Sequence, residues 1–151
     1  MTGQSHLDGP LWETNAFRSP FHDMAGFRML EWREGFVRIR CDLQSHHQNR
    51  QGAVHGGVVL ALIDEAGGAA GVWSADPAVN RKSVSVTLDA KFVGRAQGDY
   101  VEVTGRVAGH GRSLYFVQSE VRDAHGTLVA FGTSTHRWRR GSAPPEPAGE
   151  P

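Results

Sequence analysis

The segment from Val58 to Trp73 limits the possible folds more than any other part of the sequence. It runs for about 16 residues, and its only charged side chains are Asp64 and Glu65. That length exceeds an ordinary buried strand, and a helix that is apolar on every side is typical of one enclosed by other elements. We therefore predict one long buried helix, which Gly56-Gly57 opens and Asp76-Pro77 closes.

Three glycines interrupt this predicted helix, namely Gly67, Gly68 and Gly71. Each costs roughly 1 kcal/mol relative to alanine in a helix interior. A sequence that accepts this cost indicates close approach by another backbone. We expect that backbone to belong either to a sheet that wraps the helix or to a helix of a partner subunit.

The remaining apolar residues predict strands on both sides of the helix. Before it, 27–33 and 36–43 form a hairpin around Glu34-Gly35. After it, apolar and polar residues alternate in a way that is typical of half-buried strands. These later strands are expected at 83–92, 101–107, 113–123 and 127–137. Short connections favour antiparallel neighbours, so we expect a four-stranded meander. The predicted class is α+β, a long central helix wrapped by a curved antiparallel sheet of about five to six strands.

We divide the chain into three parts. Residues 1–26 form an N-terminal segment that can hold a short helix over 12–17, with Pro10 and Pro20 as breakers. Residues 27–138 form the folded domain. Residues 139–151 are rich in proline and are expected to be a disordered tail.

Composition excludes several classes of function. The 16 Lys and Arg residues balance 16 Asp and Glu residues, which argues against nucleic acid or an anionic membrane as the main partner. The single cysteine, Cys41, leaves no intrachain disulfide and no zinc site of paired cysteines. The N-terminus does not resemble a secretory signal, and no apolar run is long enough to span a membrane. We expect a cytoplasmic protein.

The histidines do not predict a metal site. Five of them show no metal-ligand spacing: His46, His47, His110, His125 and His136. We therefore assign no metal.

Two places on the predicted helix could carry chemistry. At its start, Gly56 and Gly57 supply unpaired backbone N–H groups that attract negative charge and allow close approach of a ligand. The alternative is a glycine-rich loop that merely enters a crowded helix. In its middle, a buried carboxylate is costly unless it is paired, which makes Asp64 a candidate for function. Glu65 fits an exposed strip equally well.

The spacing of these two places predicts a shared site between subunits. Gly56 and Asp64 are eight residues apart, about 12 Å along a helix at 1.5 Å per residue and about 80° around it. An Asp64 carboxylate cannot reach an atom held at the start of its own helix. If both act on one carbonyl, they come from different chains of a two-fold dimer.

A longer motif joins these residues. Asn49, two residues, Gly52, two residues and His55-Gly56-Gly57 are followed by Asp64 nine positions after the histidine. This pattern resembles the signature of the hotdog-fold acyl-CoA thioesterases, most of all the branch related to the phenylacetate-pathway enzymes and human THEM2. The resemblance extends over about residues 27–138.

The resemblance implies a hotdog fold, a homodimer that often doubles to a tetramer, and hydrolysis of an acyl-CoA without a further cofactor. Asp64 would be the nucleophile or the base that activates water, and Ser85 would assist it. The Gly56 N–H would polarise the carbonyl, while His55 and Asn49 would position the reactants. The segments that would hold coenzyme A contain Gly57, Phe92, Arg95, Gly111, Arg112 and Ser113. Arg95 replaces a proline that many members carry, and it offers a cation for a phosphate.

Two other functions are alternatives to this one. A non-catalytic acyl-CoA-binding or sensing protein could share the fold, although no basic helix for DNA binding is evident. An enoyl-CoA hydratase of the same fold would carry a histidine about five residues after the aspartate. Ala69 stands there, which argues against the hydratase.

Overall fold

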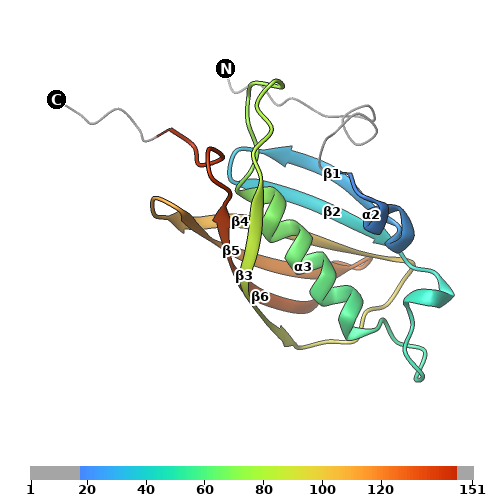
Figure 1. Ribbon diagram of the computed structural model, residues 1–151. Helices are drawn as coiled ribbons and strands as arrows, with labels where there is room; N and C mark the ends of the chain where they lie inside the picture. Colours follow the sequence, from blue (N-terminus) through green and yellow to red (C-terminus); the bar gives the residue numbers. More distant parts are fainter. Residues whose placement is uncertain (1–17, 146–151) are drawn as a thin grey trace, which may run out of the picture.

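The computed structural model describes residues 18–145, and Figure 1 shows one helix, α3, lying along the concave side of a curved sheet. The elements in chain order are α2 (Pro20–Ala25), β1 (Phe27–Arg33), β2 (Phe36–Asp42), a 3-10 turn (Ser45–His47), α3 (Gly56–Ala70), β3 (Ser83–Phe92), β4 (Tyr100–His110), β5 (Leu114–Asp123) and β6 (Leu128–Trp138). This arrangement confirms the predicted α+β class and the hotdog architecture of one central helix and a wrapping antiparallel sheet.

The strand order corrects the predicted four-stranded meander. The six strands run β1-β2-β4-β5-β6-β3, and all of the pairs are antiparallel. Only β4, β5 and β6 form a meander. β3 pairs with β6 instead of with β4, and the β1–β2 hairpin joins β4. β3 is therefore an edge strand, although it lies between the helix and β4 in the sequence.

The connection from β3 to β4 is short but crosses one end of the sheet. Gly94 donates its N–H to the Val129 carbonyl at the start of β6, and Gln97 donates to the Asp123 carboxylate at the end of β5. Desolvation acts to raise the pKa of the Asp123 carboxyl, but backbone N–H donors from Gln97, Thr127 and His125 outweigh it and lower the pKa. These contacts carry the chain past two strands in a few residues, which loop length alone does not predict.

The helix α3 begins where the sequence predicts and ends earlier than predicted. His55 is its N-cap, and Gly71 caps its C-terminus, so Trp73 lies outside the helix. The face toward the sheet is buried, and its residues include Val59, Leu62, Ile63, Ala66 and Ala70. The opposite face is only half-buried, although it carries Val58, Leu60 and Ala61. The prediction that the helix is enclosed on every side is thus correct only for the face toward the sheet. In the described chain the opposite face stays partly accessible.

Close packing against the sheet explains two of the helix glycines. A Cβ at Gly67 would lie 2.2 Å from His136 Nε2, and one at Gly71 would lie 2.2 Å from the Tyr115 ring. The wrapping sheet is thus the close neighbour, but its side chains and not its backbone fill the space at these two glycines, which corrects the predicted backbone approach. The helix backbone itself approaches the sheet at Gly105 of β4, where a Cβ would lie 3.0 Å from the Ala66 carbonyl oxygen.

The predicted alternation of β3 is only partly correct. A register shift between Ser85 and Thr87 marks a β-bulge, so the side of the strand that faces α3 changes along it. Ser83 and Ser85 bond to Tyr115 and Asp64 respectively, whereas Ala90 packs against the core. Val86 is therefore 53% exposed instead of half-buried against the helix.

Residues at both ends of the domain form ordered contacts next to segments that are rich in helix-breaking residues. Ser19 caps α2, and Pro20 occupies its first turn, where proline is favoured. The helix predicted over 12–17 lies outside the described residues. At the other end, Ser142 accepts a hydrogen bond from the Lys82 N–H, so residues 139–142 contact the start of β3. Among the described residues, no helix is long and apolar enough to cross a membrane.

Candidate functional site

The start of α3 presents one backbone N–H that nothing in the described chain accepts. His55 Nδ1 accepts a hydrogen bond from the Gly57 N–H at 2.8 Å, and the Val58 N–H donates to the His55 carbonyl. Gly56 is the first residue of the helix, and its N–H has no such partner among residues 18–145. The N–H of Gly56, at the positive end of the helix dipole, is thus the donor available to a ligand.

Asn49 organises the loop that leads into this helix start. Its Oδ1 accepts hydrogen bonds from the N–H groups of Gln51 at 2.9 Å and Ala53 at 3.2 Å. Gly52 adopts a positive φ of 71°, a conformation that glycine tolerates best. These hydrogen bonds within the loop fix the Asn49 side chain a few residues before the helix start.

The residues predicted to hold coenzyme A lie at opposite ends of the sheet within one chain. Phe92 lies at the helix start, because a Cβ on Gly56 would be 3.5 Å from its ring. Arg95 is at the same end and approaches the Gln51 carbonyl at 3.4 Å. The turn that contains Gly111, Arg112 and Ser113 lies at the far end, where Ser113 accepts from the Trp138 N–H.

Asp64 and Ser85 meet two turns along the helix from Gly56. The Ser85 hydroxyl donates to Asp64 Oδ1 at 2.5 Å. The bulge in β3 directs Ser85 toward α3, and bulges often orient a side chain next to an active site. Asp64 is half-buried and Ser85 is exposed, so the carboxylate can be reached from outside. Because α3 is one continuous helix, Gly56 and Asp64 of a single chain remain apart as predicted.

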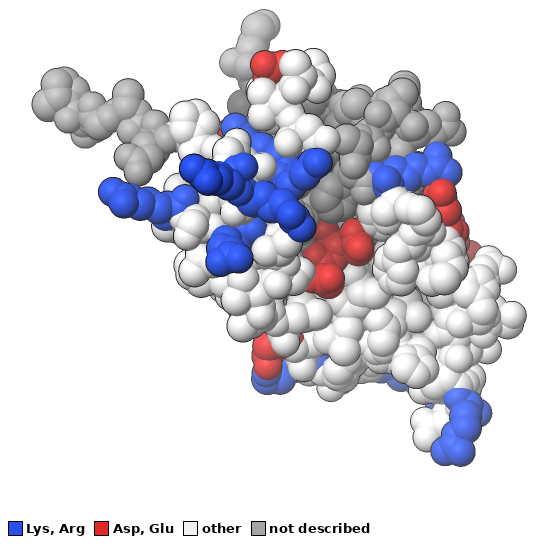
Figure 2. All heavy atoms as spheres, in the orientation of Figure 1, with Lys and Arg blue, Asp and Glu red and all other residues white. Residues whose placement is uncertain are grey.

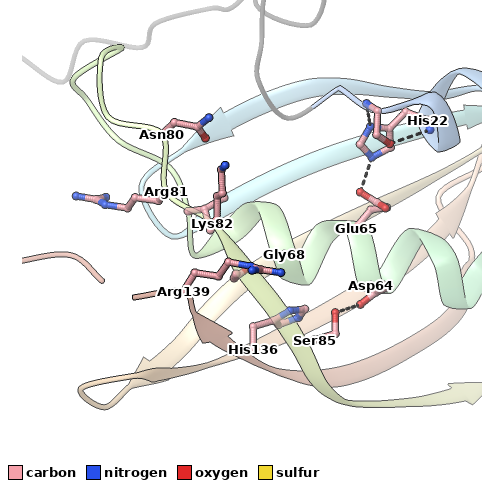
Figure 3. A pocket seen from close by; sticks show the side chains of 13 residues that line it. His22, Asp64, Glu65, Gly68, Asn80, Arg81, Lys82, Ser85, His136 and Arg139 are labelled. Atoms are coloured by element: carbon pink, nitrogen blue, oxygen red, sulfur yellow. Dashed lines mark hydrogen bonds and ion pairs between the residues drawn. The ribbon is translucent and has the colours of Figure 1, made fainter. Parts of the chain in front are cut away.

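A hollow of about 610 Å³ opens beside Asp64 (Figure 3). Asp64 and Glu65 line it on the side of α3, and the basic side chains of Arg81, Lys82 and Arg139 line it on the other. Figure 2 shows Lys and Arg atoms gathered beside an acidic area on this face. The lining of the hollow thus contains an accessible carboxylate and more basic than acidic side chains, although the whole chain has no net charge.

Glu65 has a partner of its own. Its carboxylate accepts a hydrogen bond from Nε2 of His22, a residue of α2 that is 2% exposed. The His22 Nδ1 accepts from the Ser19 N–H, which completes the cap of α2. Glu65 therefore ties the short N-terminal helix to α3, whereas Asp64 is held by a hydroxyl.

His136 is a neighbour of Asp64 that the sequence did not predict. His136 is 1% exposed, its Nε2 lies 2.9 Å from the Ser134 hydroxyl, and its Nδ1 has no hydrogen-bond partner in the described chain. Burial lowers the pKa of His136, although the negative charge of Asp64 opposes this shift. The available signal was two polar residues, Ser134 and His136, at positions of β6 that face the core.

A second hollow, of about 680 Å³, adjoins the helix start. His55, Gly57 and Val58 line it where α3 begins. Most of its remaining lining is apolar, and no Lys, Arg, Asp or Glu of residues 18–145 contributes. These residues are Phe21, Met24, Ala25, Phe27, His46, His47, Gln48 and Ala61.

His47 has a structural explanation. Its Nδ1 accepts from the Gln44 N–H, and its Nε2 lies 2.7 Å from the Ala25 carbonyl. The described residues contain no group of three or more His, Cys, Asp or Glu that could hold a metal ion.

Comparisons with known proteins agree with this architecture. The family model described as "Thioesterase superfamily" matches residues 51–130, which is more than half of the chain. A Schizosaccharomyces pombe protein named "Putative esterase" is 27% identical over 124 residues, which cover 81% of this chain and 74% of that protein.

Solved structures show the same fold. A conserved protein from Pseudomonas aeruginosa superimposes with a TM-score of 0.76 at 27% identity, over 86% of this chain and all of that one (100%). A thioesterase from Haemophilus influenzae superimposes with a TM-score of 0.75 at 18% identity, over 89% of this chain and 93% of that one.

Proposed function

Because the chain belongs to the thioesterase superfamily, we propose that it hydrolyses an acyl- or aroyl-CoA thioester to a free acid and coenzyme A. The observation that carries this proposal is the pair of features on α3, an unpartnered Gly56 N–H at its start and a reachable Asp64 carboxylate bonded to Ser85. Together they supply what thioester hydrolysis requires, namely a donor for the carbonyl oxygen and a base or nucleophile for the carbonyl carbon. The reaction requires no cofactor, since coenzyme A is part of the substrate.

The carbonyl oxygen is proposed to accept from the Gly56 N–H as negative charge develops on it. The helix dipole favours that charge, and a fixed backbone donor costs no reorganisation during the reaction. The His55 Nδ1 is used by the Gly57 N–H, so its Nε2 carries the proton and can donate. His55 and the side-chain amide of Asn49 then position the thioester or water.

Asp64 is proposed to act by one of two routes. As a base, it takes a proton from the water that forms the new C–O bond while the C–S bond breaks and the thiolate leaves. As a nucleophile, it forms a mixed anhydride as the C–S bond breaks and the thiolate leaves, and water then attacks the Asp64 carbonyl of this anhydride to release the acid. In both routes Ser85 holds the carboxylate. A single turnover in ¹⁸O-water separates the routes, because only the nucleophilic one places an unlabelled Asp64 oxygen in the first product.

A two-fold dimer is proposed to complete the site. β3 is an edge strand, and it exposes Val86, Leu88 and Phe92, an arrangement that invites pairing with a second copy. Antiparallel pairing of two β3 strands sets the Ser85 end of one beside the Phe92 end of the other. The carboxylate of one chain then approaches the helix start of its partner. Doubling of such dimers to a tetramer is the further expectation.

The same pairing places the two proposed coenzyme A segments together. Phe92 and Arg95 at the helix start of one chain would meet the Gly111–Ser113 turn of the other, which lies at the opposite end of its own sheet. The apolar hollow beside Gly57 lies between α2 and the start of α3, and it suits an apolar acyl group better than a phosphate.

A thiol-release assay over aliphatic, aromatic and hydroxylated CoA thioesters tests the proposal. We expect turnover of at least one thioester, and we expect Asp64→Asn to lower kcat by roughly 100-fold or more, the usual contribution of a positioned base. Glu65→Gln is the matched control, since it changes the adjacent carboxylate, which bonds to His22.

The alternative function is a non-catalytic acyl-CoA-binding protein. It predicts thermal stabilisation by acyl-CoA without thiol release from any member of the panel. That result, or equal activity of Asp64→Asn and the wild type, would contradict the proposed hydrolase.

A further inference from the structure

The hollow beside Asp64 carries basic side chains that the proposed chemistry does not use. Resting on the proposed function, we infer that Lys82 and Arg139 form a subsite for an anionic group of the thioester substrate. The anion is either a phosphate of coenzyme A or a carboxylate at the far end of the acyl group.

The backbone fixes these cations at the end of the sheet. Arg139 donates its N–H to the Lys82 carbonyl at 2.8 Å, and the Lys82 N–H donates to Ser142 Oγ at 3.0 Å. The start of β3 and the end of β6 are thereby held together, with one cation on each. Arg81 is anchored beside them through a 2.5 Å hydrogen bond from Nη1 to the Trp73 carbonyl.

The orientation of the side chains favours Lys82 and Arg139 over Arg81. In Figure 3, Arg139 extends over the hollow toward α3, Lys82 stands at its rim, and the Arg81 guanidinium turns away from Asp64. No carboxylate within residues 18–145 forms an ion pair with any of the three. Their charge is therefore available to a ligand, and a guanidinium suits phosphate and carboxylate alike.

The neighbouring acids limit where the anion can lie. Asp64 and Glu65 line the other side of the same hollow, and Glu65 is already paired with His22. An anion at the cations would face repulsion close to Asp64, so it must be separated from the reacting carbonyl by a spacer. Both the pantetheine arm of coenzyme A and an acyl chain with a terminal acid provide one.

The test compares Lys82→Gln/Arg139→Gln with the wild type at low ionic strength, where screening of exposed charges is weak. Both side chains are exposed, and the hydrogen bonds that place them come from the backbone, so the fold is expected to survive. Arg137→Gln is the matched control. Its neighbours His136 and Trp138 are buried against α3, so the alternation of β6 turns Arg137 to the other face of the sheet.

Four thioesters separate the two sources of the anion. A neutral and an ω-carboxylated acyl group are each attached to coenzyme A and to N-acetylcysteamine, which has no phosphate. We expect kcat/KM of the double variant to fall about tenfold or more for the thioesters that carry the recognised anion. The neutral N-acetylcysteamine thioester should be hydrolysed as by the wild type. A fall confined to the CoA thioesters identifies phosphate, and a fall confined to the ω-carboxylated ones identifies carboxylate.

An equal fall for all four thioesters, no fall for any, or the same fall in Arg137→Gln would overturn the inference. If the wild type hydrolyses none of them, the proposed function fails, and calorimetric titration with free coenzyme A and with glutarate then decides the subsite. Weaker binding of either probe to the double variant, but not to Arg137→Gln, supports it. Equal affinity, or no binding to the wild type, refutes it.

Discussion

Replacement of Gly67 by alanine tests how closely α3 packs on the sheet beneath the site. The added Cβ would lie 2.2 Å from His136 Nε2 and 2.3 Å from Ser134 Oγ, and both distances are shorter than real Cβ contacts allow. The two neighbours are 1% and 2% exposed, so neither can move into solvent. Overpacking of this kind costs about 1–3 kcal/mol. Loss of the His136–Ser134 hydrogen bond adds about 1 kcal/mol, and the higher helix propensity of alanine returns about 1 kcal/mol.

The expected result is a net loss of about 1–3 kcal/mol in the free energy of unfolding. With a denaturant slope of about 2 kcal/mol/M, the urea midpoint should fall by roughly 0.5–1.5 M. Unfolding is followed by circular dichroism at one protein concentration, because association changes apparent stability. Gly109→Ala is the control, since nothing lies within 4 Å of its added Cβ. A Gly67→Ala protein as stable as the wild type would refute the close packing that we infer.

Two further predictions concern side chains that contact the same helix. Ser85→Ala removes the 2.5 Å hydrogen bond to Asp64 and should lower kcat about 5- to 30-fold, since a hydrogen bond to a charged group contributes about 1–2 kcal/mol at a partly exposed site. Thr87→Ala, beyond the bulge, is the control and should leave steady-state kinetics unchanged. Equal kinetics for the two variants would contradict the assigned role of Ser85. Burial raises the pKa of Tyr115 to about 12, so the stability that its protonated hydroxyl contributes is fully present below the unfolded pKa of about 10 and is lost as pH rises to about 12. Chemical denaturation from pH 9 to pH 12 should therefore show a shallower decline for Tyr115→Phe than for the wild type, and parallel curves would argue against the buried hydroxyl.

The sequence predicted the helix and the strands well because their patterns are local. The apolar run and Gly56-Gly57 marked the start of α3, and Glu34-Gly35 marked the hairpin. The strand order could not be predicted in the same way. Whether β3 pairs with β4 or with β6 depends on contacts between residues far apart in sequence, and the short connection favours the wrong neighbour.

In the site, too, residues that are close in sequence were predicted, and residues that only the fold brings together were not. The motif placed Asn49, His55 and Gly56 around one helix start, because these residues are close in sequence. His136 was missed, since only the folded β6 brings it near Asp64. The β3 bulge was also missed, because an extra residue shifts the alternation without changing the residue types on either side of it.

Complementation between two inactive chains tests the composite site most directly. Gly56→Pro removes the N–H at the first helical position, where proline is tolerated, and His55 already has the extended conformation that precedes proline. Gly56→Pro and Asp64→Asn chains, each with its own affinity tag, are co-expressed, and dimers that carry both tags are purified. If Gly56 of one chain acts with Asp64 of the other, each mixed dimer keeps one intact site and should show about half of the wild-type kcat. A mixed dimer no more active than either parent homodimer would contradict the account.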